Sequence, residues 1–408
     1  MDLDRISSAS AMLLLPPPPS ASFEQCKNVY DPILSTVFTD LAKFNGTNHI
    51  AILDIALCLP GLHSPTCQPR AKLFKSLQGL LANIYRLIGI VSVENNIELD
   101  APGGIDPRVI LLDFDSVHLP EKDSLPVSPM GPILDLKTLA KSARLWDRIY
   151  YLDNQVGQNL ATAFSSIYSQ FKDPNAGTLH SISGASTWTP SKSIVVPDDS
   201  RESQTHHSVI VGGTFDHFHI GHKLLLTALA LVLDPVRPTT PRKEVLLTIG
   251  VTGDELLVNK KYAECLESWN ERCESAASFL TAIMDFYPPD KSAIHTERVT
   301  QPGPNGKYIL INLVQLGLTL KFVQISDPFG PTITEENISA IVVSQETRSG
   351  GTAVNEERAK KGWKSLDVFE IDVLHSKDVS SSDFENFASK ISSTDIRRQR
   401  MEQLEAKK

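Results

Sequence analysis

The chain has few cysteines and no motif that would use them. Its 408 residues include five cysteines, an odd number, and no two of them form a Cys-x-x-Cys pair. This usage argues against a disulfide framework and against a thiolate zinc site. It fits the reducing cytosol, so we expect a cytoplasmic location.

Long hydrophobic runs are absent as well. The longest, Leu224–Leu233, contains ten residues, whereas about 18 to 20 are needed to cross a bilayer. At the start of the chain, acidic Asp2 and Asp4 precede a short apolar patch that four prolines follow, so we expect no secretory signal there. We therefore expect no membrane partner.

Positive charge is also in short supply. Lys and Arg number 39 against 48 Asp and Glu, which gives a net charge of -9. Because proteins that bind nucleic acids without sequence preference carry broad basic surfaces, we expect no nucleic-acid partner. The sequence also contains neither the GxxxxGK[ST] loop of P-loop nucleotide binders nor the GxSxG elbow of serine hydrolases.

The N-terminal half predicts an α/β domain behind a mobile tail. The length of the chain predicts two or three domains. Residues 1–22 are rich in Ser and Pro, so we expect a disordered tail there. Residues 49–60 and 108–115 are apolar runs typical of buried strands, and residues 136–171 have the apolar spacing of one or two helices. Residues 23–171 are therefore interpreted as a separate α/β domain whose sequence indicates no role.

A linker and a second α/β pattern follow. Residues 172–206 are rich in Ser, Thr, Pro, Asp and Gly, which is typical of a linker. From residue 207 to 408 apolar strands alternate with helices, and this predicts a Rossmann-like, doubly wound parallel sheet. Such sheets bind ligands at the carboxyl ends of their strands, so the functional site is expected in residues 207–408.

The stretch that follows the first strand of this second domain suits phosphate chemistry. It reads GGTFDHFHIGH over residues 212–222. Gly212 and Gly213 end an apolar strand, and without Cβ atoms they let a phosphorylated ligand approach the main chain. His219 and His222 are three residues apart and would share one face of the first turn of a helix. The free N–H groups and positive dipole end of that turn favour an anion.

Other interpretations of these histidines fit the spacing less well. A zinc site of His217, His219 and His222 would lack the i, i+4 pair of HExxH and a fourth ligand, so we expect no metal held by the protein. A hydrolytic triad would lack a nucleophile beside the histidines. A helix start with satisfied hydrogen bonds is the remaining alternative, although it explains three histidines beside a Gly-Gly turn poorly.

This stretch resembles the HxGH signature of the nucleotidylyltransferase superfamily. A second signature of that superfamily, ISSTxxR, is matched by residues 391–397, where Ser392 and Asp395 also form a helix-capping pattern. Within the superfamily, GGTFDHFHIGHKLLL, GVTGDELLVNKKY and VVSQETRSGGTAVNEERAKKG are similar to the eukaryotic, fungal-type branch of pantetheine-phosphate adenylyltransferases. The similarity covers residues 207–403 and leaves the N-terminal half unexplained.

The resemblance implies transfer of AMP from ATP to 4'-phosphopantetheine, giving dephospho-coenzyme A and pyrophosphate in coenzyme A synthesis. Mg²⁺ would accompany ATP, held by the substrate. Because the sequence lacks a kinase phosphate loop, a monofunctional enzyme is expected. A cytidylyltransferase using CTP and a non-catalytic interaction protein are the alternatives, and the N-terminal domain is a candidate for contacts with other enzymes of coenzyme A synthesis.

The resemblance also implies roles for single residues. His222 would stabilise the transition state at the α-phosphate, His219 would touch the phosphates, and Lys260, in preference to its neighbour Lys261, would neutralise the acceptor phosphate. These roles require Gly213, His222 and Ser393 to meet in one cleft. The expected binding residues are Gly212, Gly213, Thr214 and Phe215 at the first motif, Ser392, Ser393, Thr394 and Arg397 for the β- and γ-phosphates, and Arg348 or Arg358 for adenine or the triphosphate.

Overall fold

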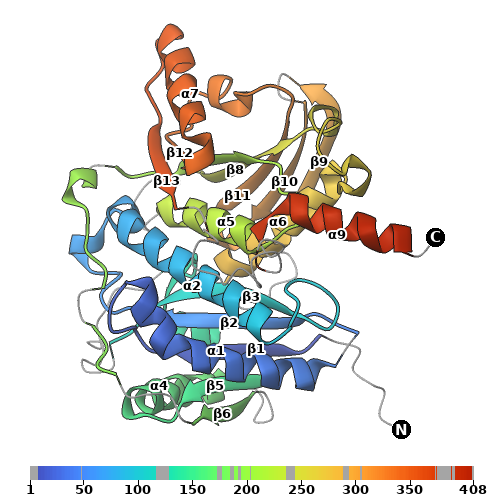
Figure 1. The fold of residues 1–408 in the computed structure, drawn as a ribbon. Coiled ribbons are helices and arrows are strands. Elements are labelled where there is room, and N and C mark those ends of the chain that lie inside the picture. Colours follow the sequence, from blue (N-terminus) through green and yellow to red (C-terminus); the bar gives the residue numbers. More distant parts are fainter. Residues whose placement is uncertain are drawn as a thin grey trace.

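The computed structural model contains two sheets, each covered by helices, and one belongs to each half of the chain (Figure 1). This confirms the expectation of two α/β domains. The structure describes residues 8–46, 48–115, 128–171, 177–183, 188–191, 194–202, 204–235, 244–287, 294–303, 306–372, 374, 387 and 391–406.

The N-terminal sheet is parallel throughout, in the order β4-β3-β2-β1-β5-β6. Alternate side chains of β1 enter cores on opposite faces of the sheet: Leu13 packs with α1 and α2, whereas Met12 packs with α3 and α4. The elements are β1 (Ser10–Leu15), α1 (Phe23–Asn45), β2 (Ala51–Cys58), η1 (Pro65–Cys67), η2 (Arg70–Leu73), α2 (Phe74–Glu94), β3 (Ile105–Asp113), β4 (Ile133–Asp135), α3 (Leu136–Lys141), β5 (Arg148–Leu152), α4 (Gln155–Phe171), β6 (Thr178–Ile182) and η3 (Asp199–Arg201).

The expectation of a disordered tail over residues 1–22 is wrong for its second half. Ser10–Leu15 is the strand β1 and pairs with both β2 and β5, in the middle of the sheet. A parallel strand buried on both faces needs a continuous apolar run rather than alternation, and Ala11 to Leu15 supply one. The four prolines that follow end the strand. Residues 1–7 lie outside the described part of the chain.

The interpretation of residues 172–206 as a linker is wrong in part. Thr178–Ile182 is the edge strand β6 of the N-terminal sheet, and only its last residue is buried. This strand was not predicted because its sequence is polar, and an edge strand needs no alternation of apolar residues. Further along, the indole N–H of Trp188 donates to the carbonyl of Pro17 at 2.8 Å, so this residue also packs on the N-terminal domain.

The region predicted as one or two helices over residues 136–171 contains a strand between its helices. Helix α3 ends at Lys141, strand β5 covers Arg148–Leu152, and α4 begins at Gln155. Apolar residues spaced by three or four occur in both arrangements. The sequence RIYYL of β5 is rich in β-branched and aromatic residues, which is the signal that favours a strand.

The C-terminal sheet has the order β13-β12-β7-β8-β11-β10-β9. Its five strands from β13 to β11 are parallel, as expected, whereas β10 and β9 form an antiparallel hairpin that the sequence did not predict. The elements are β7 (Ser208–Gly213), α5 (Ile220–Val232), β8 (Val245–Thr252), η4 (Asp254–Leu256), η5 (Ala263–Cys265), α6 (Trp269–Met284), β9 (Ile294–Gly303), β10 (Gly306–Leu313), η6 (Val314–Leu316), β11 (Leu318–Ile325), η7 (Gly330–Ile333), β12 (Ala340–Ser344), η8 (Gln345–Thr347), α7 (Arg348–Lys360), β13 (Asp367–Ile371) and α9 (Ser393–Ala406).

Helices α2 and α5 lie side by side where the two domains meet (Figure 1). Phe74 of α2 packs edge-on against Phe369 of β13, with ring centroids 4.9 Å apart. By length and composition residues Arg70–Glu94 would be apolar enough to cross a membrane, but 72% of that window is buried inside the protein. Helix α2 is therefore a core helix that both domains cover.

Candidate functional site

Strand β7 ends at the point where the winding of the C-terminal sheet reverses. The chain continues from β7 to β8 on one side, and β12 pairs with β7 on the other. Ligands of doubly wound sheets bind at this position, beyond the carboxyl ends of the strands. Gly212 is exposed there, and a Cβ on it would meet no atom within 4 Å, so the strand end borders open space.

Glycine is needed at the two positions of the strand end for different reasons. A Cβ on Gly213 would lie 3.0 Å from the ring of Phe215, which is fully buried beneath it. Gly213 is thus required by the packing of the loop, whereas Gly212 leaves room for a ligand. Phe215, expected to line the ligand pocket, contributes the support of the loop instead.

The loop between β7 and α5 has a strained backbone. Phe215 and His217 adopt left-handed conformations, with φ of 54° and 47°, which non-glycine residues rarely do. Such strain persists only where the surroundings enforce it. Arg272 of α6 is fully buried and donates to the carbonyl of Thr214 at 2.8 Å, while the carboxylate of Glu267 accepts the N–H of His217 at 2.9 Å.

Sequence reasoning missed this support. Arg272 also donates to the carbonyl of Glu267 and forms an ion pair with Asp254, so all three branches of its guanidinium are occupied. Asp216, inside the first motif, is completely buried and accepts the N–H of Glu267 at 2.9 Å. Arg272 could not be recognised from the sequence, because an arginine in an amphipathic helix usually faces solvent. Asp216 could have been considered, because it lies within the first motif.

His219 caps helix α5. Its Nδ1 accepts the N–H of Gly221 at 3.1 Å, so the proton of the neutral ring must be on Nε2. The Nε2 atom lies 3.3 Å from Oγ of Ser393 and donates to it. Burial lowers the pKa of His219 well below its usual value, with His222 and His217 adding to the effect, so the ring is neutral at pH 7. A Cβ on Gly221 would lie 3.0 Å from this ring, which explains the glycine of the motif.

The same contact brings the second motif to the first. Helix α9 begins at Ser393, and Oγ of Ser392 accepts the N–H of Asp395 at 3.4 Å, as the capping pattern predicted. The starts of α5 and α9 therefore meet at the pair His219 and Ser393. Two helix N-termini with free N–H groups and positive dipole ends form a site suited to an anion of high charge.

His222 lies one turn into α5 in a stack of rings. Its ring centroid lies 3.9 Å from that of His219 and 5.6 Å from that of Phe218. Burial lowers the pKa of His222 to about 3, against a smaller opposing effect of Glu267. The ring is therefore a neutral donor at pH 7. Its Nδ1 is buried without a hydrogen-bond partner, so no protein group is bound to that atom.

Arg397 is placed differently from what the resemblance implied. Its guanidinium pairs with Asp216, donates to the carbonyl of Lys261 at 3.0 Å and to Oγ1 of Thr394 at 3.2 Å. The side chain is 3% exposed. All of its branches thus bind protein, and Arg397 holds the loop of the first motif instead of presenting its charge to the β- and γ-phosphates.

Arg358 is bound by main-chain groups of the protein itself. It is buried and donates to five main-chain carbonyls, those of Lys364, Thr332, Glu335, Glu336 and Ile338. Its guanidinium is thus taken up by protein carbonyls, and the expected role at adenine or the triphosphate stays a prediction. Its partner in that expectation, Arg348, lies at the exposed start of α7 and forms a two-branched ion pair with Glu370 of β13.

Lys260 and Lys261 both lie exposed between η4 and η5. The carbonyl of Lys261 accepts from Arg397, and the N–H of Lys260 closes a turn on Leu257 at 2.9 Å. This segment is thereby tied to the first motif, and both ammonium groups are free to face solvent or a ligand.

The described residues hold one cluster with metal-ligand chemistry, Asp216, His217 and Glu267, whose ligand atoms lie within 4.8 Å of one another. Asp216 and Nε2 of His217 in this cluster are already bound by protein groups. Asp216 pairs with Arg397 and accepts the N–H of Glu267, and Nε2 of His217 lies 2.7 Å from the carbonyl of Cys265 and can only donate to it. This cluster does not resemble an open site for Mg²⁺, which prefers carboxylates and waters.

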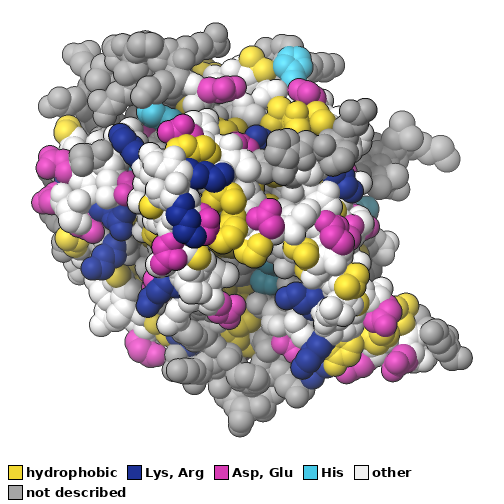
Figure 2. Space-filling view, turned by 90° about the horizontal axis from the view of Figure 1, so that it is seen from above, with side chains coloured by type: hydrophobic (Ala, Val, Ile, Leu, Met, Phe, Trp, Pro, Cys, Tyr) yellow, Lys and Arg dark blue, Asp and Glu magenta, His cyan; other side chains and the backbone are white. Residues whose placement is uncertain are grey.

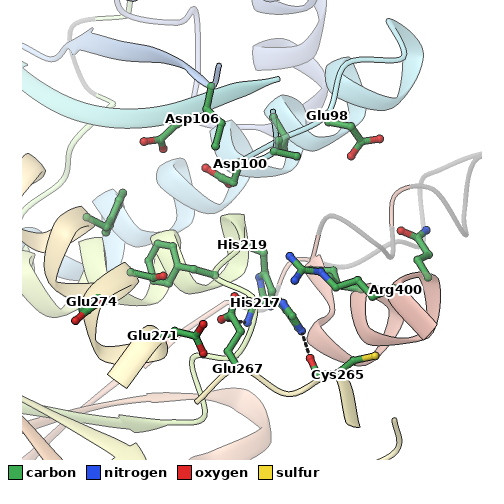
Figure 3. Close-up of a pocket in the computed structure, with 18 of the residues that line it drawn as sticks. Glu98, Asp100, Asp106, His217, His219, Cys265, Glu267, Glu271, Glu274 and Arg400 are labelled. Carbon is green, nitrogen blue, oxygen red and sulfur yellow. Dashed lines mark hydrogen bonds and ion pairs between the residues drawn. The ribbon is translucent and has the colours of Figure 1, made fainter. Parts of the chain in front are cut away.

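A cavity of about 1160 Å³ lies beside the motif, between the two domains. In Figure 3, Glu98, Asp100 and Asp106 of the N-terminal domain face His217, His219 and Arg400 of the C-terminal domain across it. The N-terminal domain thus reaches the neighbourhood of the paired histidines. On the face that Figure 2 shows, the Lys and Arg side chains of the described residues are interspersed with Asp and Glu.

Comparison with known proteins identifies the class of this domain. Residues 210–399 match the family model described as cytidylyltransferase-like, and residues 1–188 match a domain of unknown function. The C-terminal domain therefore belongs to the nucleotidylyltransferase superfamily and is a nucleotidyltransferase domain.

The whole chain has a relative of similar length. It is 31% identical over 337 residues to the uncharacterized protein C1F12.08 of Schizosaccharomyces pombe, covering 82% of this chain and 83% of that protein. The chain belongs to the same family as this protein.

Relatives with a named activity match the C-terminal domain only. The phosphopantetheine adenylyltransferase of Saccharomyces cerevisiae is 32% identical over 198 residues, 48% of this chain, and the chain spans 50% of its length. The phosphopantetheine adenylyltransferase of Thermococcus kodakarensis is 28% identical over 171 residues, which are 42% of this chain and 78% of that protein.

Proposed function

We propose that the chain is a pantetheine-phosphate adenylyltransferase, which transfers AMP from ATP to 4'-phosphopantetheine and releases pyrophosphate. The observation that carries the proposal is the contact of His219 with Ser393, which joins the starts of α5 and α9. Similarity to two proteins named phosphopantetheine adenylyltransferase supports this acceptor.

The proposed reaction needs alignment and charge stabilisation more than covalent help. An oxygen of the acceptor phosphate attacks the α-phosphorus of ATP, and the bond from that phosphorus to the β-phosphate oxygen breaks. Negative charge grows on the α-phosphate oxygens and on the departing pyrophosphate. The neutral ring of His222 would donate a hydrogen bond to the former, and the helix starts at His219 and Ser393 would face the latter.

The remaining candidates would serve the two substrates. Gly212 leaves space for the acceptor phosphate at the strand end, and Lys260 would neutralise its charge. Ser392, Ser393 and Thr394 would offer hydroxyl and main-chain donors to ATP. Mg²⁺ would enter bound to ATP, because the buried carboxylate of Asp216 is already engaged. When bound, it would neutralise phosphate charge.

The test of this function is a comparison of acceptors. Purified protein is mixed with Mg²⁺ and ATP and with 4'-phosphopantetheine, nicotinamide mononucleotide or phosphocholine in turn, and pyrophosphate is assayed. Release with 4'-phosphopantetheine alone is the expected result. Release only with another acceptor, or with none, contradicts the proposal.

A second candidate function rests on the description of the matching family, which is cytidylyltransferase-like. A cytidylyltransferase would use the same arrangement of helix starts with CTP. Replacing ATP by CTP in the assay separates the two, because the first function requires ATP.

The proposed enzyme is monofunctional and cytoplasmic. No phosphate loop of the GxxxxGK[ST] type occurs in these 408 residues, so we expect no phosphorylation of dephospho-coenzyme A. Incubation of the protein with dephospho-coenzyme A and ATP checks this, since formation of coenzyme A would refute it.

A further inference from the structure

Lys223 directly follows His222 in helix α5 and is bound by the other domain. Its ammonium lies 2.7 Å from Oδ1 of Asp100, 2.5 Å from Oδ1 of Asp106 and 3.2 Å from the carbonyl of Pro107. An ammonium group has three donors, and these three acceptors match them. The side chain is 1% exposed, so a complete set of bonds joins the N-terminal domain to the first turn of α5.

One of the acceptors, Asp106, is itself held in place. Arg108 binds Oδ2 of Asp106 with two nitrogens, at 2.9 and 2.6 Å. Lys223, Asp100, Asp106 and Arg108 thus form a network of two basic and two acidic side chains. In Figure 3 Asp100 and Asp106 lie on the wall of the cavity opposite His219. Because all three donors of its ammonium have acceptors, Lys223 has little freedom to move.

The N-terminal domain also contacts α5 at two other places. Arg70 is buried and donates to the carbonyl of Leu233, at the C-terminal end of the helix, at 3.2 Å. Helix α2 approaches closely at Gly89, where a Cβ would lie 2.9 Å from Ile220, the first residue of α5. The helix that carries both histidines is therefore held along its length by the other half of the chain.

We propose that the N-terminal domain positions the catalytic helix, with Asp100 and Asp106 acting through Lys223 to set the places of His219 and His222. The N–H of Lys223 donates to the carbonyl of His219 at 3.0 Å, so a shift of Lys223 moves the capping turn. Displacement of a catalytic group by about 1 Å can cost 10²-fold in rate. The proposal rests on the proposed nucleotidyl transfer and gives the N-terminal domain a part in it.

The test uses the full chain and a charge-balanced double variant. Lys223→Met with Asp100→Asn removes one basic and one acidic side chain and leaves Asp106 paired with Arg108. We expect the thermal midpoint to stay within a few degrees of wild type, turnover to fall by about tenfold or more, and the KM values for ATP and acceptor to change by less than about threefold. Unchanged turnover in the folded double variant overturns the proposal.

A matched control breaks another contact between the same domains. Gln78 of α2 donates to Oδ2 of Asp372 at 3.0 Å and accepts its N–H at 2.9 Å, after the end of β13. Gln78→Ala should leave turnover at the wild-type value. An equal loss of turnover in Gln78→Ala would mean that any weakening of the domain contact suffices, and would refute the specific role of Lys223.

Two further measurements keep the proposal testable. Asp106→Glu retains the charge and lengthens the side chain by one methylene, so it should lower turnover even where the double variant fails to fold; unchanged turnover refutes positioning. Ring N–H signals of His219 and His222 in nuclear magnetic resonance spectra should shift in the variants of the network and stay unchanged in Gln78→Ala. These signals need no substrate, so they decide the positioning role even where the acceptor assay refutes the adenylyltransferase.

Discussion

Nε2 of His219 lies 3.3 Å from Oγ of Ser393, although 174 positions separate the two residues in the chain. The contact joins a strand-loop-helix unit to the last helix of the domain. It also fixes the ring state of His219, because a ring that accepts at Nδ1 and donates at Nε2 must be neutral. The proposed polyphosphate site would thus consist of main-chain dipoles and uncharged donors, with Lys260 and Lys261 nearby in the chain segment bound to Arg397.

Replacement of His222 by alanine should lower turnover by about 10² to 10³, the usual cost of losing one preorganised donor. The KM for ATP should change less, because the donor acts mainly on charge that develops in the transition state. Steady-state pyrophosphate release measures both. His295→Ala, at an exposed histidine of β9, is the control and should behave as wild type. A His222→Ala protein within about threefold of wild-type turnover would favour a non-catalytic role.

Replacement of Arg358 by methionine should destabilise the protein and spare nucleotide binding. Five main-chain carbonyls would lose their donor, two of them in buried bonds, so we expect the free energy of unfolding to fall by roughly 2 kcal/mol or more. Denaturant unfolding measures this loss. ATP affinity of the folded protein, measured by calorimetry, should stay within about twofold; a larger loss of affinity at full stability would restore Arg358 to the ligand site.

Replacement of Gly221 by alanine should impair activity without unfolding the protein. Alanine is a better helix former than glycine by about 1 kcal/mol, but its Cβ would press on the capping ring of His219. We expect lower turnover with a thermal midpoint close to wild type. Gly79→Ala in α2 is the matched control, since its Cβ would meet only an ordinary contact at 3.8 Å. Wild-type turnover in Gly221→Ala would show that the cap does not matter for catalysis.

Lys260→Ala should raise the KM for the acceptor, and Lys261→Ala should do so less. Lys260→Ala would remove a charge expected at the acceptor phosphate. Lys261 holds the segment to Arg397 through its main-chain carbonyl, which the alanine variant keeps. Acceptor titrations at saturating ATP compare the two variants. The reverse order would assign the phosphate to Lys261.

Asp100 and Asp106, which both accept from Lys223, should contribute to stability with opposite dependence on pH. Burial raises the pKa of Asp100 to about 7, with Lys223 opposing and Asp106 reinforcing the change. Its contribution to stability is complete below its unfolded pKa near 4 and is lost as pH rises through 7. Burial would raise the pKa of Asp106 too, but Lys223 and Arg108 lower it to about 2. Its contribution is complete above pH 4 and is lost as pH falls through 2.

Denaturant unfolding between pH 3 and 8 checks these signs. Asp100→Asn should gain stability relative to wild type as pH rises from 4 to 8, because the variant cannot lose a proton. Asp106→Asn should be more costly at pH 7 than at pH 3. Parallel profiles for the two variants would contradict the assignment.

The motifs of the site could be predicted from sequence, and so could the meeting of its two helix starts. These features can be recognised because each depends on residues close together in the sequence. They are a Gly-Gly strand end, two histidines three residues apart and a capping serine. The roles of Arg358 and Arg397 could not be predicted, because only the fold determines whether a guanidinium faces carbonyls or solvent. Strand β1 was missed since a central parallel strand has no alternation, and β6 since an edge strand has few apolar residues.

Helix α2 is buried by both domains, so the chain cannot be divided between them without exposing it. One side of this apolar helix rests on its own sheet and another on α5 of the neighbouring domain. Production of either half alone would expose apolar surface to solvent, on α2 in one fragment and on α5 in the other. Such fragments would be prone to aggregate or to bind lipid, so the two halves are best regarded as one folding unit.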